Sequence, residues 1–229
     1  MAMRAELLDT LNLPGVIPAR QRRSRAAMLA LLERGLAMLG TRSFADLSVA
    51  ELCAAEGCTI GAFYARFEGK EAFLRALQLL VVGEARLGMA ARLTEARFAG
   101  MGLRAVVERL VAGSVRWSCR HEGLIRASLR AAQDDPAAWS PLRELGRLQA
   151  DLAEPLLLAR LGRAPAEADR ARLRFGFQVL FGTLNNMVLV NPGPFSIHHP
   201  ATPGLLAEAV FRTIQGEAPC SEAPGSQPA

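Results

Sequence analysis

Cysteine and histidine are the side chains of this sequence that could bind a metal or act in catalysis. The four cysteines are Cys53, Cys58, Cys119 and Cys220. None has the spacing of metal ligands, so we expect reduced and mostly buried thiols. The adjacent His198 and His199 could bind a metal, but in a proline-rich loop we expect only a loop detail. Because nucleophile motifs and paired carboxylates are also lacking, the sequence predicts no metal, no cofactor and no enzyme.

Polar side chains that could cap helices are concentrated in residues 48–73, SVAELCAAEGCTIGAFYARFEGKEAF. Ser48 followed by Glu51 fits a capping box, in which the serine hydroxyl caps the backbone N–H of the glutamate and the glutamate reaches back. Gly57 can adopt the positive φ that ends a helix, and Thr59 can cap the next one. The pattern predicts two short helices joined by a tight turn.

Two short helices braced by a longer preceding helix form a helix-turn-helix, whose second helix enters the DNA major groove. The preceding helix is predicted over 20–39, where apolar residues recur at helical spacing before Gly40. Many helical corners share this spacing, so it is weakly specific by itself.

Residues from Arg22 to about Leu77 closely resemble the N-terminal DNA-binding domain of TetR-family transcriptional regulators. The resemblance is carried by MLALLERGLAMLG, by SVAELCAAEGCTIGAFYARF and by KEAFLRAL. The family pattern has a small hydroxyl residue, a Phe-Tyr pair, and a closing Phe, short spacer and Lys. The matching residues here are Thr59, Phe63, Tyr64, Phe67 and Lys70.

The resemblance implies that Thr59 and Tyr64 hydrogen-bond DNA phosphates and that Lys70 pairs with another phosphate at the start of its helix. Tyr64 is the only tyrosine of the chain and Lys70 its only lysine, and the resemblance places both on the DNA side. Ser48 is expected to be both a helix cap and a phosphate donor. The alternatives are a half-buried packing role for Tyr64 and a solvated charge for Lys70.

The predicted recognition helix TIGAFYARF is poor in side chains that could read bases. Ile60 and Ala62 could contact thymine methyl groups at most, and Gly61 permits close approach of the backbone. Arg66 stands where the family usually has His or Tyr; it contacts a phosphate or a guanine, or lies on the helix surface. We expect base readout to depend on Thr59, Arg66 and the backbone at Gly61.

Arginines crowd the start of the first long helix: Arg20, Arg22, Arg23 and Arg25. They could contact phosphates or the minor groove, or form a solvated helix start. The net charge of +5 and isoelectric point near 9.7 are compatible with a nucleic-acid partner but do not identify one.

The composition predicts an all-α protein: 51% of residues are hydrophobic, and strand-favouring residues are sparse. We expect a flexible arm over 1–19, a helix-turn-helix domain over 20–80, a helical ligand-binding and dimerisation domain over 81–215, and a disordered tail over 216–229. Further helices are expected at about 70–97, 103–121, 124–133, 141–161, 165–190 and 205–214. The N-terminus lacks a signal-peptide pattern and no apolar run is long enough to span a membrane, which predicts a cytoplasmic protein.

The helix predicted over 103–121 has one face that changes from apolar to polar along its length. This pattern suits a mostly apolar pocket with a few hydrogen-bonding groups, or a partly wet helix end. Arginines nearby could neutralise an acidic ligand or be surface charges. The predicted ligand-binding residues are Ser114, Trp117, His121, Arg126 and Arg130.

The segment RLRFGFQVLFGTLNNMVLV is apolar nearly all round and therefore needs burial on two sides. It is either a central core helix or, as the resemblance implies, part of a four-helix interface in a homodimer. The predicted interface residues are Phe177, Phe181, Leu184, Val188, Leu205 and Phe211.

The sequence as a whole predicts a dimeric regulator that binds a palindromic operator in double-stranded DNA. A small, largely apolar effector would release this repressor from its operator by favouring the state that does not bind DNA. The alternative is a TetR-like fold that binds lipid or a protein partner without specific DNA binding.

Overall fold

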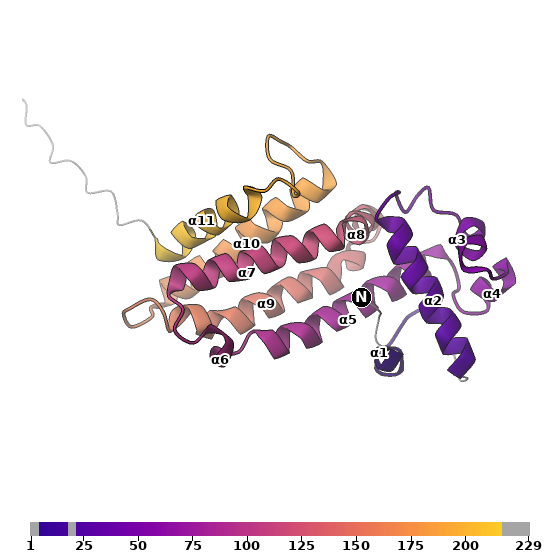
Figure 1. Cartoon of the computed structure of the whole chain (residues 1–229), viewed down its shortest axis with the longest axis horizontal. Helices are drawn as coiled ribbons and strands as arrows, with labels where there is room; N and C mark the ends of the chain where they lie inside the picture. Colours follow the sequence, from indigo (N-terminus) through magenta and orange to yellow (C-terminus); the bar gives the residue numbers. More distant parts are fainter. Residues whose placement is uncertain (1–4, 18–21, 217–229) are drawn as a thin grey trace, which may run out of the picture.

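The structure is a computed structural model that describes residues 5–17 and 22–216. Figure 1 shows helices joined by short connections, with no strand in these two ranges. The helices are α1 (Ala5–Thr10), α2 (Arg22–Leu39), α3 (Val49–Glu56), α4 (Ile60–Tyr64), α5 (Lys70–Arg92), α6 (Glu95–Phe98), α7 (Leu103–Arg120), α8 (Glu122–Asp134), the 3₁₀ helix η1 (Pro136–Trp139), α9 (Ser140–Leu158), α10 (Glu167–Leu189) and α11 (Thr202–Gln215). The all-α prediction is confirmed. None of the helices just given is long and apolar enough to cross a membrane.

Two large hydrophobic cores organise the molecule, with a smaller third cluster between α5 and α9. The first is built mainly from α1 to α5, and the second from α7, α9, α10 and α11. Figure 1 shows α3 and α4 at the end of the molecule opposite α11. The domain boundary expected between residues 80 and 81 falls inside α5, so the two regions share one helix.

Residues 5–17 are not the flexible arm that the sequence predicted. Leu7 of α1 is buried in the first core. Further along, the N–H of Ile17 donates to the carbonyl of Arg66 at 2.8 Å, and the N–H of Glu68 donates to the carbonyl of Gly15 at 2.9 Å. This segment therefore supports the chain directly after α4. Residues 18 and 19 lie outside the described residues, as does the predicted tail beyond Gly216.

The helix predicted over 70–97 is divided into α5 and α6. The backbone leaves helical geometry at Leu93, and Arg160 from the end of α9 holds the segment that follows. Its guanidinium donates to the carbonyls of Phe98 and Met101, both at 2.9 Å, and pairs with Glu95. These bonds to non-helical backbone compete with continuation of the long helix.

Helix α8 connects the two regions by packing against the end of α2. At Gly123 an added Cβ would lie 1.8 Å from the carbonyl oxygen of Leu39, a distance that no side chain tolerates. Nearby, the Nε2 of Gln78 in α5 donates to the carbonyl of Ala138 at 2.7 Å. The head, formed by α2 to α4 and the first half of α5, is thus in direct contact with the helices of the larger region.

Replacing Gly123 by Ala tests this contact. We expect Gly123→Ala to lower the free energy of unfolding by about 1–3 kcal/mol, because backbone atoms of Leu39 must move to admit the methyl group. Gly113→Ala is the matched control: an added Cβ there meets nothing within 4 Å, so the better helix propensity of Ala should raise stability by up to about 1 kcal/mol. Urea denaturation measures both, and equal effects would contradict the close α2–α8 packing.

Candidate functional site

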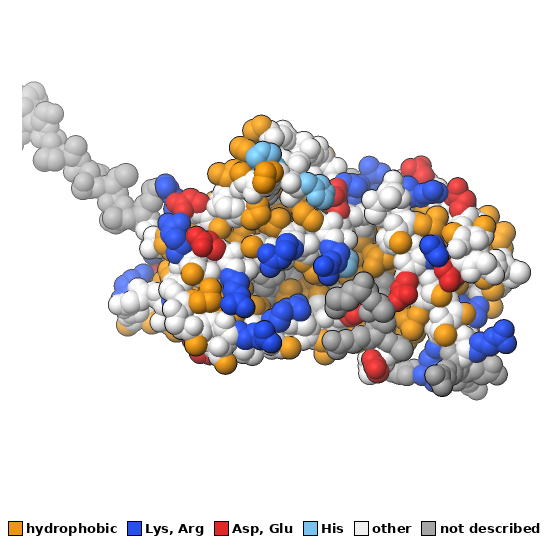
Figure 2. Space-filling model, in the orientation of Figure 1, with side chains coloured by type: hydrophobic (Ala, Val, Ile, Leu, Met, Phe, Trp, Pro, Cys, Tyr) orange, Lys and Arg blue, Asp and Glu red, His pale blue; other side chains and the backbone are white. Residues whose placement is uncertain are grey.

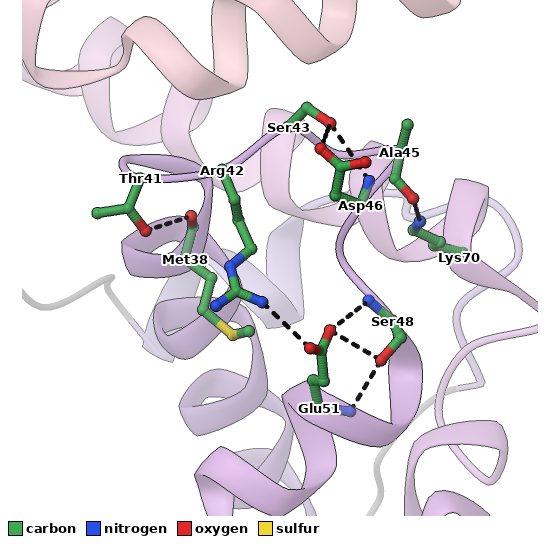
Figure 3. A network of polar contacts seen from close by, with 9 residues as sticks. All are labelled: Met38, Thr41, Arg42, Ser43, Ala45, Asp46, Ser48, Glu51 and Lys70. Atoms are coloured by element: carbon green, nitrogen blue, oxygen red, sulfur yellow. Dashed lines mark hydrogen bonds and ion pairs between the residues drawn. The ribbon is translucent and has the colours of Figure 1, made fainter.

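The start of α3 is held by the capping box that the sequence predicts (Figure 3). The N–H of Glu51 donates to the hydroxyl of Ser48 at 3.1 Å, and the N–H of Ser48 donates to the Glu51 carboxylate at 3.2 Å. Arg42 pairs with the same carboxylate at 3.4 Å. The hydrogen bonds from Ser48, assisted by Arg42, hold the pKa of Glu51 below its usual range. The loop before α3 is therefore fixed to the helix at its first turn.

The turn between α3 and α4 has the geometry that its residues suggest. Gly57 ends α3 with φ 69°, in the left-handed region that glycine favours, and its N–H points back to the last turn of the helix. Thr59 then begins α4 by accepting a hydrogen bond from the N–H of Ala62 at 3.1 Å. The predicted helix-turn-helix is confirmed, because the caps at Ser48, Gly57 and Thr59 are all formed.

An aromatic cluster fixes α4 against the rest of the head. Phe63, Phe67 and Phe73 are almost completely buried, and their ring centroids lie 5.1 to 5.6 Å apart. Because Phe73 belongs to α5, the cluster attaches one side of α4 to that helix. The opposite side of α4 is left facing solvent.

The solvent side of α4 carries the residues predicted to contact DNA. Tyr64 is 52% exposed, with its ring edge-on to Phe63 at 5.3 Å, and Ile60 is 49% exposed. Thr59 and Gly61 are also exposed, whereas Ala62 is half-buried. A half-exposed tyrosine supported by a buried phenylalanine presents its hydroxyl in a defined direction. A large apolar side chain such as Ile60 has no packing reason to lie on this surface.

The basic residues of the head differ in what they contact. Lys70 donates to the carbonyl of Ala45 at 3.1 Å (Figure 3). Its ammonium also lies 4.6 Å from the ring centroid of Phe44. Arg66 donates to the carbonyls of Ala62 and, at 3.5 Å, Ser24. The structure thus shows Arg66 folded between α4 and α2. Arg23 is exposed near the start of α2. Arg22 begins α2, but its side chain and all of Arg20 lie outside the described parts.

A cavity of about 970 Å³ lies in the larger region between α5, α7, α9 and α10. Two predicted ligand-binding residues, Ser114 and Trp117, line it. The Nε2 of Gln149 donates to the hydroxyl of Ser114 at 2.8 Å, and both side chains are buried. Trp139 also lines the cavity, so both tryptophans of the chain face it. Sequence reasoning missed Gln149 of α9 and Trp139 of η1, because only the packing of these elements in the fold brings them to the cavity.

Three other predicted ligand-binding residues do not line this cavity. His121 is partly buried at the junction of α7 and α8, with its ring 4.8 Å from that of Trp117. Arg126 pairs with Glu122 and donates to the carbonyl of Val188 at 3.0 Å, a structural role. Arg130 is exposed on α8. Helical periodicity predicted His121 at the pocket and charge predicted the two arginines, but α7 ends before His121 and the arginines belong to α8.

Of the three described cysteines only Cys53 is buried, whereas Cys58 and Cys119 are partly exposed, so burial of most thiols was predicted wrongly. Cys53, Cys58 and Cys119 are free thiols, and burial raises the pKa of Cys53 to about 11. Within residues 5–17 and 22–216, no three His, Cys, Asp or Glu side chains gather where they could hold a metal ion. Cys220 lies outside these ranges.

Comparison with known proteins places the head in a family. Residues 31–77 match the family model of bacterial regulatory proteins of the tetR family. The chain carries a TetR-family N-terminal domain. This match covers the end of α2, the capped α3, the turn, α4 and the first part of α5. No protein among the curated ones matches the sequence.

Solved structures of TetR proteins share the fold over most of their length. A TetR transcriptional regulator from Rhodococcus sp. RHA1 is 19% identical with TM-score 0.50, and the alignment covers 84% of this chain and 98% of that one. A tetR-family transcriptional regulator from Streptomyces coelicolor is 19% identical with TM-score 0.57, covering 82% and 80%. Salmonella enterica GusR is 15% identical with TM-score 0.57, covering 86% and 100%. At these identities the likeness shows the fold, and it extends into the larger helical region.

The residues predicted for a TetR-type dimer interface need correction. Most of them are packed inside one chain: Phe177, Leu184, Val188 and Phe211 are buried in the second core, and Phe181 lines the cavity. Leu205 is the exception, at 49% exposure on α11. The exposed apolar residues of α10 are instead Phe175 at 56% and, just past its end, Val190 at 65%. The all-round apolar pattern did not distinguish the core face from the outer one.

The buried His121 makes stability depend on pH. Burial, with a smaller effect of the Arg120 charge, lowers its pKa from 6.5 to about 4. The unfolded chain therefore binds a proton near pH 6.5 that the folded chain does not accept, so stability is full above this pH and falls as the pH decreases toward 4. Between pH 7.5 and 5 we expect a loss of about 2 kcal/mol in the free energy of unfolding.

Denaturation of His121→Phe at the same two pH values isolates this contribution. The variant should lose most of the pH dependence between 7.5 and 5, whatever its own stability at pH 7.5. His199→Asn is the control, because His199 is exposed, and should keep the dependence of the original chain. An unchanged slope in His121→Phe would contradict the assignment.

Proposed function

We propose that this protein is a DNA-binding transcriptional regulator whose recognition surface is the solvent side of α4. The observation that carries the proposal is the exposed set Thr59, Ile60 and Tyr64 on a helix that is rigidly capped and packed, within the domain matched by the tetR family model. A second helix of a helix-turn-helix is the element that such domains place in the major groove.

Phosphate contacts account for most of the proposed binding. Tyr64 and Thr59 offer hydroxyls at either end of α4, and Ser48 offers a third at the start of α3. Lys70 is proposed to exchange its bond with Ala45 for one with a phosphate, since the ammonium forms an ion pair with the phosphate that a neutral carbonyl cannot offer. Arg23 could reach the same strand from α2. Arg66, held by two carbonyls, is proposed to support α4.

Base contacts are proposed to be few and mostly apolar. Ile60 projects from the first turn of α4, where its exposed side chain can meet a thymine methyl group. Gly61 leaves space for the DNA backbone or a base edge, because an added Cβ there would meet only Thr59 Oγ1, at 3.8 Å. Such a surface is suited to recognising shape and methyl groups more than hydrogen-bond patterns.

We propose a homodimer formed through the outer faces of α10 and α11. Phe175 and Gly182 are exposed along α10, Val190 is exposed just past its end, and Leu205 is exposed on α11. Gly182 has nothing within 4 Å of an added Cβ, so a second helix could approach closely there. A two-fold dimer would present two copies of α4 to the half-sites of a palindromic operator.

The cavity is proposed to hold the effector, and the outcome is proposed to be repression relieved by ligand. Trp117 supports this coupling because it lines the cavity and also packs against the core of the head. A ligand that fits only one arrangement of α7 would favour the corresponding position of the head.

Binding selection with random DNA tests the proposal. The protein should enrich a palindromic duplex, and fluorescence anisotropy should show tighter binding to it than to a scrambled duplex. Tyr64→Phe should weaken binding about tenfold or more, since it removes a hydrogen bond to a charged phosphate in each subunit but keeps the ring packing on Phe63.

Arg86→Gln is the matched control for this experiment, because Arg86 is exposed on α5 at a distance along the chain from the head. It should bind DNA like the original protein, and circular dichroism should show that both variants are folded. If no duplex is enriched and Tyr64→Phe has no effect, the alternative function gains support: a TetR-like fold that binds lipid or a protein partner. The scarcity of base-reading side chains on α4 favours that alternative.

A further inference from the structure

Basic side chains gather around the cavity of the larger region. Figure 2 shows Lys and Arg side chains around a recess over α5, α7 and α9, with hydrophobic side chains between them. Of the residues that line the cavity, only Asp151 is acidic. The lining arginines fall into two groups that differ in their existing partners.

One group is already engaged by the protein. Arg109 donates to the carbonyl of Arg97 at 3.1 Å and lies over the ring of Phe98, Arg143 donates to the hydroxyl of Ser140 at 2.8 Å, and Arg174 lies 3.5 Å from the carboxylate of Glu154. The side chains of the second group line the cavity without a hydrogen bond or ion pair to any described residue. Its members are Arg92, Arg97, Arg116, Arg120 and Arg147.

The unpaired group is unusual in a chain that pairs many of its arginines. Arg34, Arg42, Arg104, Arg126, Arg160, Arg163, Arg170 and Arg172 all have a carboxylate within 4 Å. Like charges placed around one opening repel each other and create a positive potential that a low-dielectric wall focuses into the cavity. An anion there would remove this repulsion.

The inside of the cavity has a different chemistry. Leu110, Phe177, Phe181 and Leu184 supply apolar surface from α7 and α10. Of the two buried polar side chains, Ser114 is satisfied internally, since it donates to the carbonyl of Leu110 at 3.1 Å and accepts from Gln149. A ligand group at this depth therefore needs little polarity, while a group at the opening meets arginines.

We propose that the cavity binds an amphipathic anion, with an apolar chain against Leu110, Phe177 and Leu184 and a carboxylate or phosphate head at the arginine-lined opening. This inference deepens the proposed effector role of the cavity and rests on it for its regulatory meaning. The binding itself can be measured without DNA. A neutral or cationic ligand of the same length would leave the arginine charges uncompensated and bind more weakly.

The tryptophans provide the readout, because Trp117 and Trp139 both line the cavity and are the only ones in the chain. Dodecanoate and dodecyl phosphate, each below its micelle concentration, should change the tryptophan fluorescence in a saturable way, and calorimetry should give matching constants. Dodecanol and dodecylamine should bind at least about tenfold more weakly. The two anions also distinguish a carboxylate from a phosphate head.

Arg116→Gln with Arg120→Gln should weaken dodecanoate binding about tenfold and leave dodecanol binding unchanged, since each exposed charge pair contributes up to about 1 kcal/mol. Arg86→Gln is the matched control and should bind like the original protein. Dodecanol binding as tight as dodecanoate, or no loss in the double variant, would overturn the proposal.

The same protein preparation is then mixed with the duplex that the binding selection enriched. This measurement separates failure of the anion site from failure of the proposed function. Anion binding without any DNA binding would overturn the regulator function and leave the anion site standing. DNA binding with no response of tryptophan fluorescence to either anion would overturn the anion site alone. Release of the duplex by dodecanoate, absent in the double variant, would support both.

Discussion

Burial of α5 in two places is the constraint on which the rest of the structure depends. Its first half places Phe73 and Leu77 in the core of the head, and its second half places Val82 and Ala85 against Leu142 and Leu145 of α9. A 23-residue helix is about 35 Å long and moves as a unit. The position of the recognition helix, attached to α5 through the Phe63–Phe67–Phe73 cluster, therefore depends on packing in the larger region.

Trp117 is the second connection between the regions. Its partly buried side chain packs against all three hydrophobic clusters and lines the cavity. One turn further, the chain passes His121 and reaches Gly123, where α8 meets the end of α2. Because packed interiors do not deform continuously, a change in what Trp117 contacts must be taken up by moving whole helices. A change at the cavity can therefore displace the head in two ways, through the α7–α8 turn or through α5.

Much of the fold could be predicted from local signals, and the errors have a common cause. Three features depend on neighbours within a few residues and could therefore be predicted from the sequence alone. They are the capping box at Ser48, the turn at Gly57 and the burial of Phe63 and Phe67. The cavity residues and the proposed dimer face depend on which side of α7 or α10 meets another helix. Helical spacing gives a face but not its partner, which is why the sequence predicts His121 in the cavity and Phe177 at a dimer interface.

The head is arranged so that binding DNA replaces contacts as well as adding them. Lys70 already donates to Ala45, and Arg66 already donates to Ala62 and Ser24. A phosphate contact made by Lys70 exchanges an ammonium–carbonyl bond, which is itself charge-assisted, for an ion pair, so its net gain is only the difference between the two. Tyr64 is half-exposed, and its hydroxyl exchanges only contacts with solvent for a phosphate. Affinity built from small differences and a few hydroxyls responds to small displacements of α4, and the proposed control by a distant cavity requires this sensitivity.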